Sequence, residues 1–156
     1  MGIKIGDRIP KFSIKDYEGI ELDSEDLIGA PVVLYFYPKD DTPGCTSEAC
    51  SFRDSLDMFD ELETIVLGVS PDDAKSHIQF IKKHDLNFTL LCDEKLELAT
   101  KFGAIQEREK EGMKIPSVLR STFLIDPQGI VRWMEKPVSV EGHAERVLLA
   151  VKQLGL

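Results

Sequence analysis

The sequence predicts an α/β fold in which helices flank a central mixed sheet. Three observations support this class. Segments rich in β-branched and aromatic residues alternate with segments of helical spacing, a hairpin pattern precedes this alternation, and a second hairpin pattern and a last helix follow it. An alternating order of this kind is typical of helices packed against a partly parallel sheet.

The N-terminal segment predicts a short β-hairpin. Residues 11–15 and 20–22 alternate between apolar and polar side chains around residues 16–19, which end in glycine. Ser24 follows, with Glu25 and Asp26 directly after it. We therefore expect Ser24 to cap one short turn of helix.

Two strand and helix pairs follow in the centre of the chain. Residues 32–37 predict a strand, and residues 46–59 carry helical spacing after a Pro-Gly turn. Residues 64–70 form a continuous apolar run that predicts a buried strand. Residues 70–73 then open a helix with a cap and a proline at its first position, and this helix should run to about His84.

The C-terminal part predicts the remaining elements. They are a short strand over 89–93, a helix over 96–102 ending at Gly103, a hairpin of 121–126 with 130–134, and a final helix over 141–153. This order is that of a thioredoxin-like domain with additions, the first being the N-terminal hairpin extension. No repeat or linker divides the sequence, so residues 1–156 should form a single domain.

Composition excludes several classes of protein. The net charge of −9 argues against nucleic-acid binding, which needs clustered lysine and arginine. No apolar run is long enough to span a membrane, and the N-terminus has no apolar signal segment. Three cysteines without disulfide spacing favour a reducing compartment, so we expect a cytoplasmic protein.

Cys45 lies where the predicted strand over 32–37 gives way to a helix. Unpaired backbone N–H groups and the positive end of the helix dipole lie at such a position, and both favour thiolate over thiol. Cys45 is therefore a candidate nucleophile. The alternative for Cys45 and for Cys50 is that each is a small buried hydrophobic residue.

The same helix restricts Cys50. Two Cα atoms five residues apart on an ideal helix are ~8.6 Å apart, beyond the ~7 Å limit for a disulfide. Cys45 and Cys50 can therefore pair only if the first turns of the helix unwind. Such a pair would belong to a catalytic or switching cycle rather than serve as a structural staple.

One long motif resembles a known family. Pro38, Thr42 and Cys45 match the Pro-x-x-x-Thr-x-x-Cys signature of peroxiredoxins, and residues 42–54 resemble the bacterioferritin comigratory protein (peroxiredoxin Q) branch. The resemblance extends over nearly the whole chain, including the segment 120–126 that begins with an arginine.

The resemblance assigns roles to five residues. It implies that Cys45 is the peroxidatic nucleophile, that Arg120 completes the site, and that Glu48 orients this arginine. It also implies that Thr42 directs its hydroxyl toward the peroxide and that Pro38 shields the thiolate from water. Without the resemblance, these residues have ordinary explanations: a surface arginine, a solvated acid in the first helical turn, a turn-capping hydroxyl and a strand terminator.

The resemblance also implies a cycle. Hydroperoxide would oxidise Cys45 to a sulfenic acid, Cys50 would resolve it as an intramolecular disulfide, and a thioredoxin-like or other dithiol reductant would reduce that disulfide. We expect a monomer without a cofactor or metal, and without nucleic-acid or membrane partners. Two features depart from the pattern: residues 105–116 lack the aromatic residues of many relatives, and Cys92 is an extra thiol, most simply one in the core.

Three alternatives remain at this stage. A metal-binding module would use Cys45, Cys50 and Cys92 with His77 or His84, but no second cysteine or histidine pair with ligand spacing is present. A non-enzymatic thiol peroxide sensor would use the same thiol chemistry. A dithiol exchange protein would need Cys-x-x-Cys, which is absent. The three histidines are expected at the surface.

Overall fold

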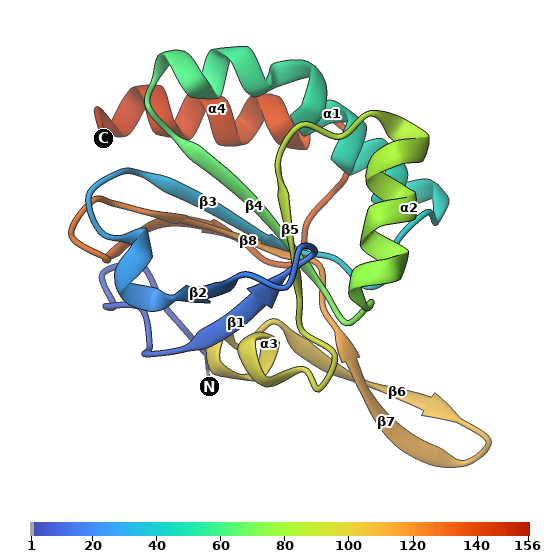
Figure 1. Ribbon diagram of the computed structural model, residues 1–156. Coiled ribbons are helices and arrows are strands. Elements are labelled where there is room, and N and C mark those ends of the chain that lie inside the picture. The colour runs from blue at the N-terminus through green and yellow to red at the C-terminus, as the bar shows by residue number, and fades with distance from the viewer. Residues whose placement is uncertain (1) are drawn as a thin grey trace.

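The computed structural model describes residues 2–156 (Figure 1). A seven-stranded sheet has the order β2-β1-β5-β4-β3-β8-β9. Its strands are β1 (Ser13–Asp16), β2 (Glu21–Asp23), β3 (Val32–Phe36), β4 (Ile65–Ser70), β5 (Thr89–Cys92), β8 (Ser121–Ile125) and β9 (Val131–Glu135). The helices are η1 (Ser24–Leu27), α1 (Pro43–Glu61), α2 (Ala74–His84), α3 (Glu97–Phe102) and α4 (His143–Leu154). The predicted α/β class with a central mixed sheet is confirmed.

The sheet is mixed because its centre and its edges pair differently. β3, β4 and β5 run parallel, whereas β1, β2, β8 and β9 pair antiparallel with their neighbours. All five residues of β3 are buried. This continuous apolar run is the pattern expected of a strand that is covered on both faces.

The side chains of β3 alternate between two cores. Val32, Leu34 and Phe36 pack in the core that includes α3 and the N-terminal segment. Val33 and Tyr35 pack in the core formed with α1, α2 and α4, which lie together on the other face of the sheet (Figure 1). The two-residue period of a strand produces this division.

Three helix starts differ from the sequence-based expectation. α1 begins at Pro43, three residues before the predicted start at residue 46, so Cys45 lies inside the first turn. α2 is capped by Asp73, whose carboxylate accepts from the Ser76 N–H, and the preceding proline lies outside the helix. The cap of η1 is Asp23. The Ser24 hydroxyl instead accepts from the Phe12 N–H.

One hairpin was not predicted. β6 (Ile105–Lys110) and β7 (Met113–Val118) pair only with each other and extend away from the main sheet as an arm (Figure 1). Most of its side chains are exposed and many are charged, so the apolar alternation that marks a half-buried strand is missing. In the part of the chain that the structure covers, no helix has the length and apolar character needed to cross a membrane.

Candidate active site

Cys45 is the third residue of α1 and is 1% exposed. Pro43 suits the first helical position because the N–H that it lacks would have no partner there. A Cβ atom at Gly44 would lie 3.4 Å from Nη2 of Arg120, so the guanidinium lies beside the first turn of the helix. The local sequence therefore places a thiol at the positive end of a 19-residue helix.

Arg120 joins two residues of α1. Its Nη2 donates to Cys45 Sγ at 3.2 Å, and its Nη1 donates to Glu48 Oε1 at 2.7 Å. Cys45 and Glu48 lie three residues apart and therefore on the same side of the helix. Arg120 comes from the segment between β7 and β8, and it binds both through the fork of its guanidinium.

Burial makes these charges depend on one another. The carboxyl of Glu48 is fully buried, and this burial raises its pKa to about 7, against the opposing effect of Arg120. Burial acts to lower the pKa of Arg120, but the charges of Glu48 and Cys45 raise it above the ordinary value. Arg120 therefore remains a cation, and it is the group in the site that stabilises negative charge.

A buried histidine lies behind Glu48. His143, the first residue of α4, is fully buried, and its Nε2 lies 2.8 Å from the Thr122 hydroxyl and 3.8 Å from Glu48 Oε2. Its Nδ1 lies 3.4 Å from a carboxylate oxygen of Glu135. Burial lowers the pKa of His143 to about 4, so the ring is neutral near pH 7.

The expectation that the histidines lie at the surface was wrong for two of them. His77 and His143 are both fully buried, whereas the His84 side chain is 21% exposed. His143 is followed by the apolar spacing of α4, whose inward residues include Ala144 and Val147. That spacing was the signal in the sequence that could have placed His143 inside.

Thr42 and Pro38 lie in the segment that connects β3 to α1. Thr42 is the N-cap residue of α1, yet its hydroxyl donates to the Lys39 carbonyl at 3.0 Å instead of accepting from the helix. Pro38 follows β3 and is half-buried. Neither side chain makes a hydrogen bond with Cys45, so their roles in peroxide binding remain predictions.

The other two cysteines are half-buried, and all three thiols are free. Cys50 lies on α1 with Cys45, as predicted, and the helix is continuous between them. Cys92 ends β5, where burial and nearby carboxylates raise its pKa to about 11. Within residues 2–156, the group of acidic, histidine or cysteine side chains close enough to share a metal ion is Asp40 with Asp72 and His77, and it contains no cysteine.

Residues 5–134 match the model of the AhpC/TSA family. The chain is 41% identical to the putative peroxiredoxin Bcp of Coxiella burnetii over 95% of this chain and 98% of the relative. It is 42% identical to the peroxiredoxin Bcp of Bacillus subtilis, over 99% and 98% of the two chains.

Solved structures show the same likeness. Peroxiredoxin Q of Xanthomonas campestris superposes with a TM-score of 0.88 at 37% identity, covering 93% of this chain and 92% of that chain. A cysteine mutant of Xylella fastidiosa PrxQ superposes with a TM-score of 0.93 at 33% identity, covering 100% and 99%. A further likeness, at 36% identity, is to a complex of the Xanthomonas campestris bacterioferritin comigratory protein described for its alkyl peroxide reduction activity. These likenesses confirm the predicted thioredoxin-like fold.

Proposed function

This chain belongs to the AhpC/TSA family and is a peroxiredoxin, a thiol-dependent peroxidase, and we propose that Cys45 is its peroxidatic nucleophile. The observation that supports this assignment is the 3.2 Å contact between Arg120 Nη2 and Cys45 Sγ. Of the three thiols, Cys45 combines a helix N-terminus with a guanidinium. Both stabilise the thiolate, which is the reactive form.

In the first step, the Cys45 thiolate attacks one oxygen of the hydroperoxide and the O–O bond breaks. The sulfur becomes a sulfenic acid, and the other oxygen leaves with the bonding electrons and takes a proton to give water or an alcohol. Arg120 lies where this negative charge moves from sulfur to the departing oxygen. Its second nitrogen is fixed on Glu48, so the guanidinium is already oriented before the reaction begins.

Thr42 and Pro38 form the peroxide side of the site in this proposal. Because the Thr42 hydroxyl donates its proton to the Lys39 carbonyl, the lone pairs of its oxygen can accept a hydrogen bond from the peroxide O–H. Pro38 has no N–H and presents an apolar ring, which suits the exclusion of water from the thiolate. The relative in Xanthomonas campestris is described for alkyl peroxide reduction, and we extend this substrate class, with hydrogen peroxide, to the present chain.

The second half of the cycle uses Cys50. Its sulfur attacks the sulfenic sulfur of Cys45, an S–S bond forms, and the hydroxyl group leaves as water. Because α1 is continuous from residue 43 to residue 61, this step requires the start of the helix to unwind. A thioredoxin-like dithiol then supplies two electrons and two protons and restores both thiols. Intramolecular pairing needs no second subunit, and we propose a monomer that works in the reducing cytoplasm.

The test is steady-state peroxide consumption with a thioredoxin system, comparing the wild type with Cys45→Ser, Cys50→Ser and Cys92→Ser. We expect loss of activity for the first, loss of disulfide-dependent turnover for the second and little change for the third. If the wild type is oxidised once but is not recycled by excess reductant, it is a peroxide sensor and the catalytic proposal is wrong. Activity that survives Cys45→Ser would exclude Cys45 as the nucleophile.

A further inference from the structure

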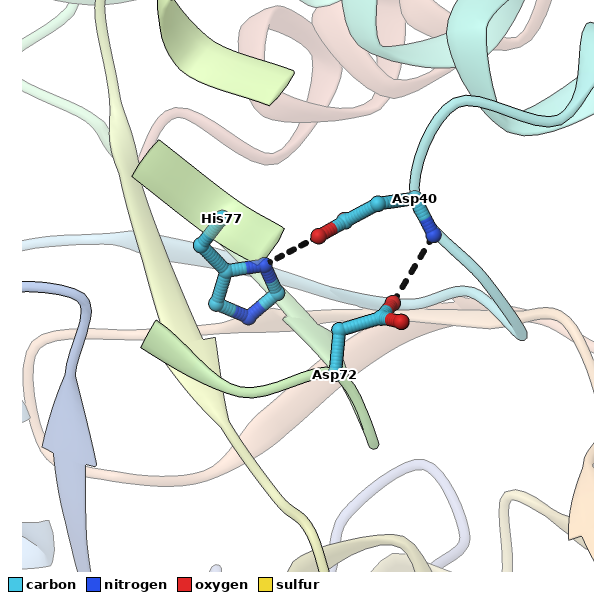
Figure 2. A group of neighbouring side chains, drawn as sticks. All are labelled: Asp40, Asp72 and His77. Carbon is cyan, nitrogen blue, oxygen red and sulfur yellow. Dashed lines mark hydrogen bonds and ion pairs between the residues drawn. The ribbon is translucent and has the colours of Figure 1, made fainter. Parts of the chain in front are cut away.

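A buried carboxylate anchors the loop between β3 and α1. Asp40 is 8% exposed and accepts three hydrogen bonds. Its Oδ1 accepts from the Tyr37 hydroxyl at 2.6 Å, and its Oδ2 accepts from the Ser76 hydroxyl at 2.8 Å and lies 2.7 Å from His77 Nδ1. Figure 2 shows His77 pointing from α2 at this carboxylate.

The hydrogen bonds of His77 fix the protons on its ring. Nε2 lies 2.9 Å from the Leu91 carbonyl oxygen, which has no proton and can only accept. Nδ1 faces the Asp40 carboxylate, whose other neighbours are both donors. With the Asp40 carboxyl group ionised, both ring nitrogens therefore carry a proton, and His77 is an imidazolium cation paired with the Asp40 anion, with both side chains almost completely buried.

The backbone of Asp40 is held as firmly as its side chain. Its N–H donates to Asp72 Oδ2 at 2.8 Å (Figure 2), and the same oxygen accepts from the Ser70 hydroxyl at 2.7 Å. The loop is thus tied to the ends of β4 and β5 and to α2. Asp40 lies two residues after Pro38 and two before Thr42, in the middle of the segment that faces the peroxide in the proposed function.

We propose that His77 is a positioning residue that acts through Asp40 to hold the loop over residues 38–42 in the geometry that peroxide reduction requires. This inference rests on the proposed role of Cys45. The hydrogen bonds of His77 go to Asp40 and the Leu91 carbonyl, not to Cys45 or Arg120, so its contribution is the placement of Pro38 and Thr42. A charged pair suits the task because a buried carboxylate that loses its charged partner is left uncompensated, which makes displacement of the loop costly.

The same geometry argues against a metal ion among Asp40, Asp72 and His77. The Nδ1 atom that would have to bind the ion carries a proton, and that proton is already directed at Asp40. The Asp72 oxygen that faces the group accepts from two donors. The three residues form a closed hydrogen-bonded clamp, and we name them the loop clamp.

The loop clamp should open as the pH rises through the folded-state pKa of His77. Burial acts to lower the pKa of His77, but the contacts with Asp40 and the Leu91 carbonyl raise it above 6.5. The stabilisation that the His77–Asp40 pair provides is therefore complete below pH 6.5 and is lost as the pH rises through the pKa of His77 in the folded protein. The charged groups that act on His77 are Asp40 in the loop and Asp72 after β4. Tyr37, which donates to Asp40, stays neutral because its pKa lies well above 10.

The first experiment needs no substitution and no peroxide. Nitrogen NMR of the histidine ring, recorded across a pH titration of the reduced protein, reports how many protons His77 carries. We expect both nitrogens of His77 to be protonated at neutral pH, with a titration midpoint above 6.5. A neutral His77 ring at neutral pH would overturn the loop clamp, whatever the protein does with peroxide.

The second experiment measures the rate constant of Cys45 oxidation by hydrogen peroxide in single turnover. We expect His77→Leu to lower this rate constant by about tenfold to a hundredfold, the range of effects of small misplacements around a reacting centre. Alkylation of Cys45 by iodoacetamide should stay within about twofold of wild type, because Arg120 and the α1 residues from Pro43 onward keep their contacts with the thiol. His77→Asn keeps an N–H near the position of Nδ1 and should recover part of the peroxide rate.

His84→Leu is the matched control. His84 lies on the same helix and contacts the loop residue next to Asp40, with its Nε2 2.9 Å from Asp41 Oδ1. This pair is partly exposed and should therefore contribute little to the placement of the loop. If His77→Leu does not fold, Asp40→Asn breaks the same charged pair by removing its anionic partner and carries the comparison. An unchanged peroxide rate, or an equal loss in peroxide and iodoacetamide rates, would overturn the positioning role. Absence of any wild-type reaction at Cys45 would instead refute the proposed function and leave the NMR result standing.

Discussion

Arg120 Nη2 lies 3.2 Å from Cys45 Sγ, although 75 residues separate the two in the sequence. The contact forms because β3 and β8 are neighbours in the sheet, so that the chain leaving β3 toward α1 and the chain entering β8 lie at the same edge. Glu48, one helical turn after Cys45, accepts from the other end of the guanidinium at 2.7 Å. Cys45, Arg120 and Glu48 therefore form one unit.

Replacing Arg120 should impair the oxidation of Cys45 by peroxide. Arg120→Lys keeps a positive charge but cannot bind Cys45 and Glu48 at once, so we expect the second-order rate constant to fall by about 10²-fold, as when a preorganised donor is removed. Stopped-flow fluorescence of the oxidation step measures this constant. Arg108→Lys, on the exposed arm, is the control and should leave it unchanged. A decrease of the rate constant by less than about threefold would contradict the proposed role of the two guanidinium nitrogens of Arg120.

The charge of Glu48 should make stability depend on pH in an unusual direction. Its pKa of about 7 in the folded protein exceeds the ordinary 4.5, so the folded state keeps a proton that the unfolded state has already lost. The free energy of unfolding should therefore fall as the pH rises from about 4.5 to 7, by roughly a few kcal/mol at ~1.4 kcal/mol per unit. Glu48→Gln should lack this decline, as urea unfolding across the window would show.

His143 should produce the opposite trend. Its folded-state pKa of about 4 lies below the ordinary 6.5, so between these two pH values the ring binds a proton in the unfolded state but not in the folded state. Stability from this source is complete above 6.5 and is lost as the pH falls toward 4. In urea unfolding, the stability difference between wild type and His143→Gln should therefore increase with pH across this window. A difference independent of pH would mean that burial leaves the pKa of His143 at its ordinary value, which would contradict the prediction.

Cys92 should react slowly with alkylating agents. Its raised pKa of about 11 leaves almost all of it as thiol at neutral pH, although the residue is only half-buried. Peptide mapping by mass spectrometry after a short exposure to iodoacetamide should find Cys45 labelled well before Cys92, by at least tenfold in rate. Equal labelling of the two would show that exposure, not ionisation, controls reactivity in this protein.

The first turns of α1 should open when Cys45 and Cys50 pair. An intact helix keeps their Cα atoms ~8.6 Å apart, so the disulfide requires local unwinding. Amide hydrogen exchange over residues 45–52 should be at least about tenfold faster in the oxidised than in the reduced protein. Residues 53–59, later in the same helix, provide the internal control and should change much less. Equally slow exchange in both forms would exclude the unwinding step.

The loop clamp was beyond the reach of sequence reasoning. Asp40 lies 32 residues before Asp72 in the sequence, and nothing in the spacing of these two acids or of His77 distinguishes them from exposed polar residues of this chain. His143 was likewise expected at the surface, although the apolar spacing of the helix that it begins was a sign of its burial. Both were missed since burial of a polar side chain depends on partners supplied by other elements.

The arm of β6 and β7 was missed for a different reason. Its strands pair with each other at an exposed position, so no buried face imposes alternation on its sequence. Conversely, the strand over 32–36 was predicted closely because both faces of the sheet are covered there, which requires an uninterrupted apolar run.

The class of fold, the order of the main elements and the position of Cys45 at a helix start could all be read from the amino-acid sequence. These features follow from local periodicity and from a Pro-Gly turn, which act over a few neighbouring residues. The assembled fold was needed to show which guanidinium reaches the thiol, which carboxylate orients it and which histidine holds the loop. Those three contacts join residues that are 75, 72 and 37 positions apart, and chain segments so distant meet only when the sheet is assembled.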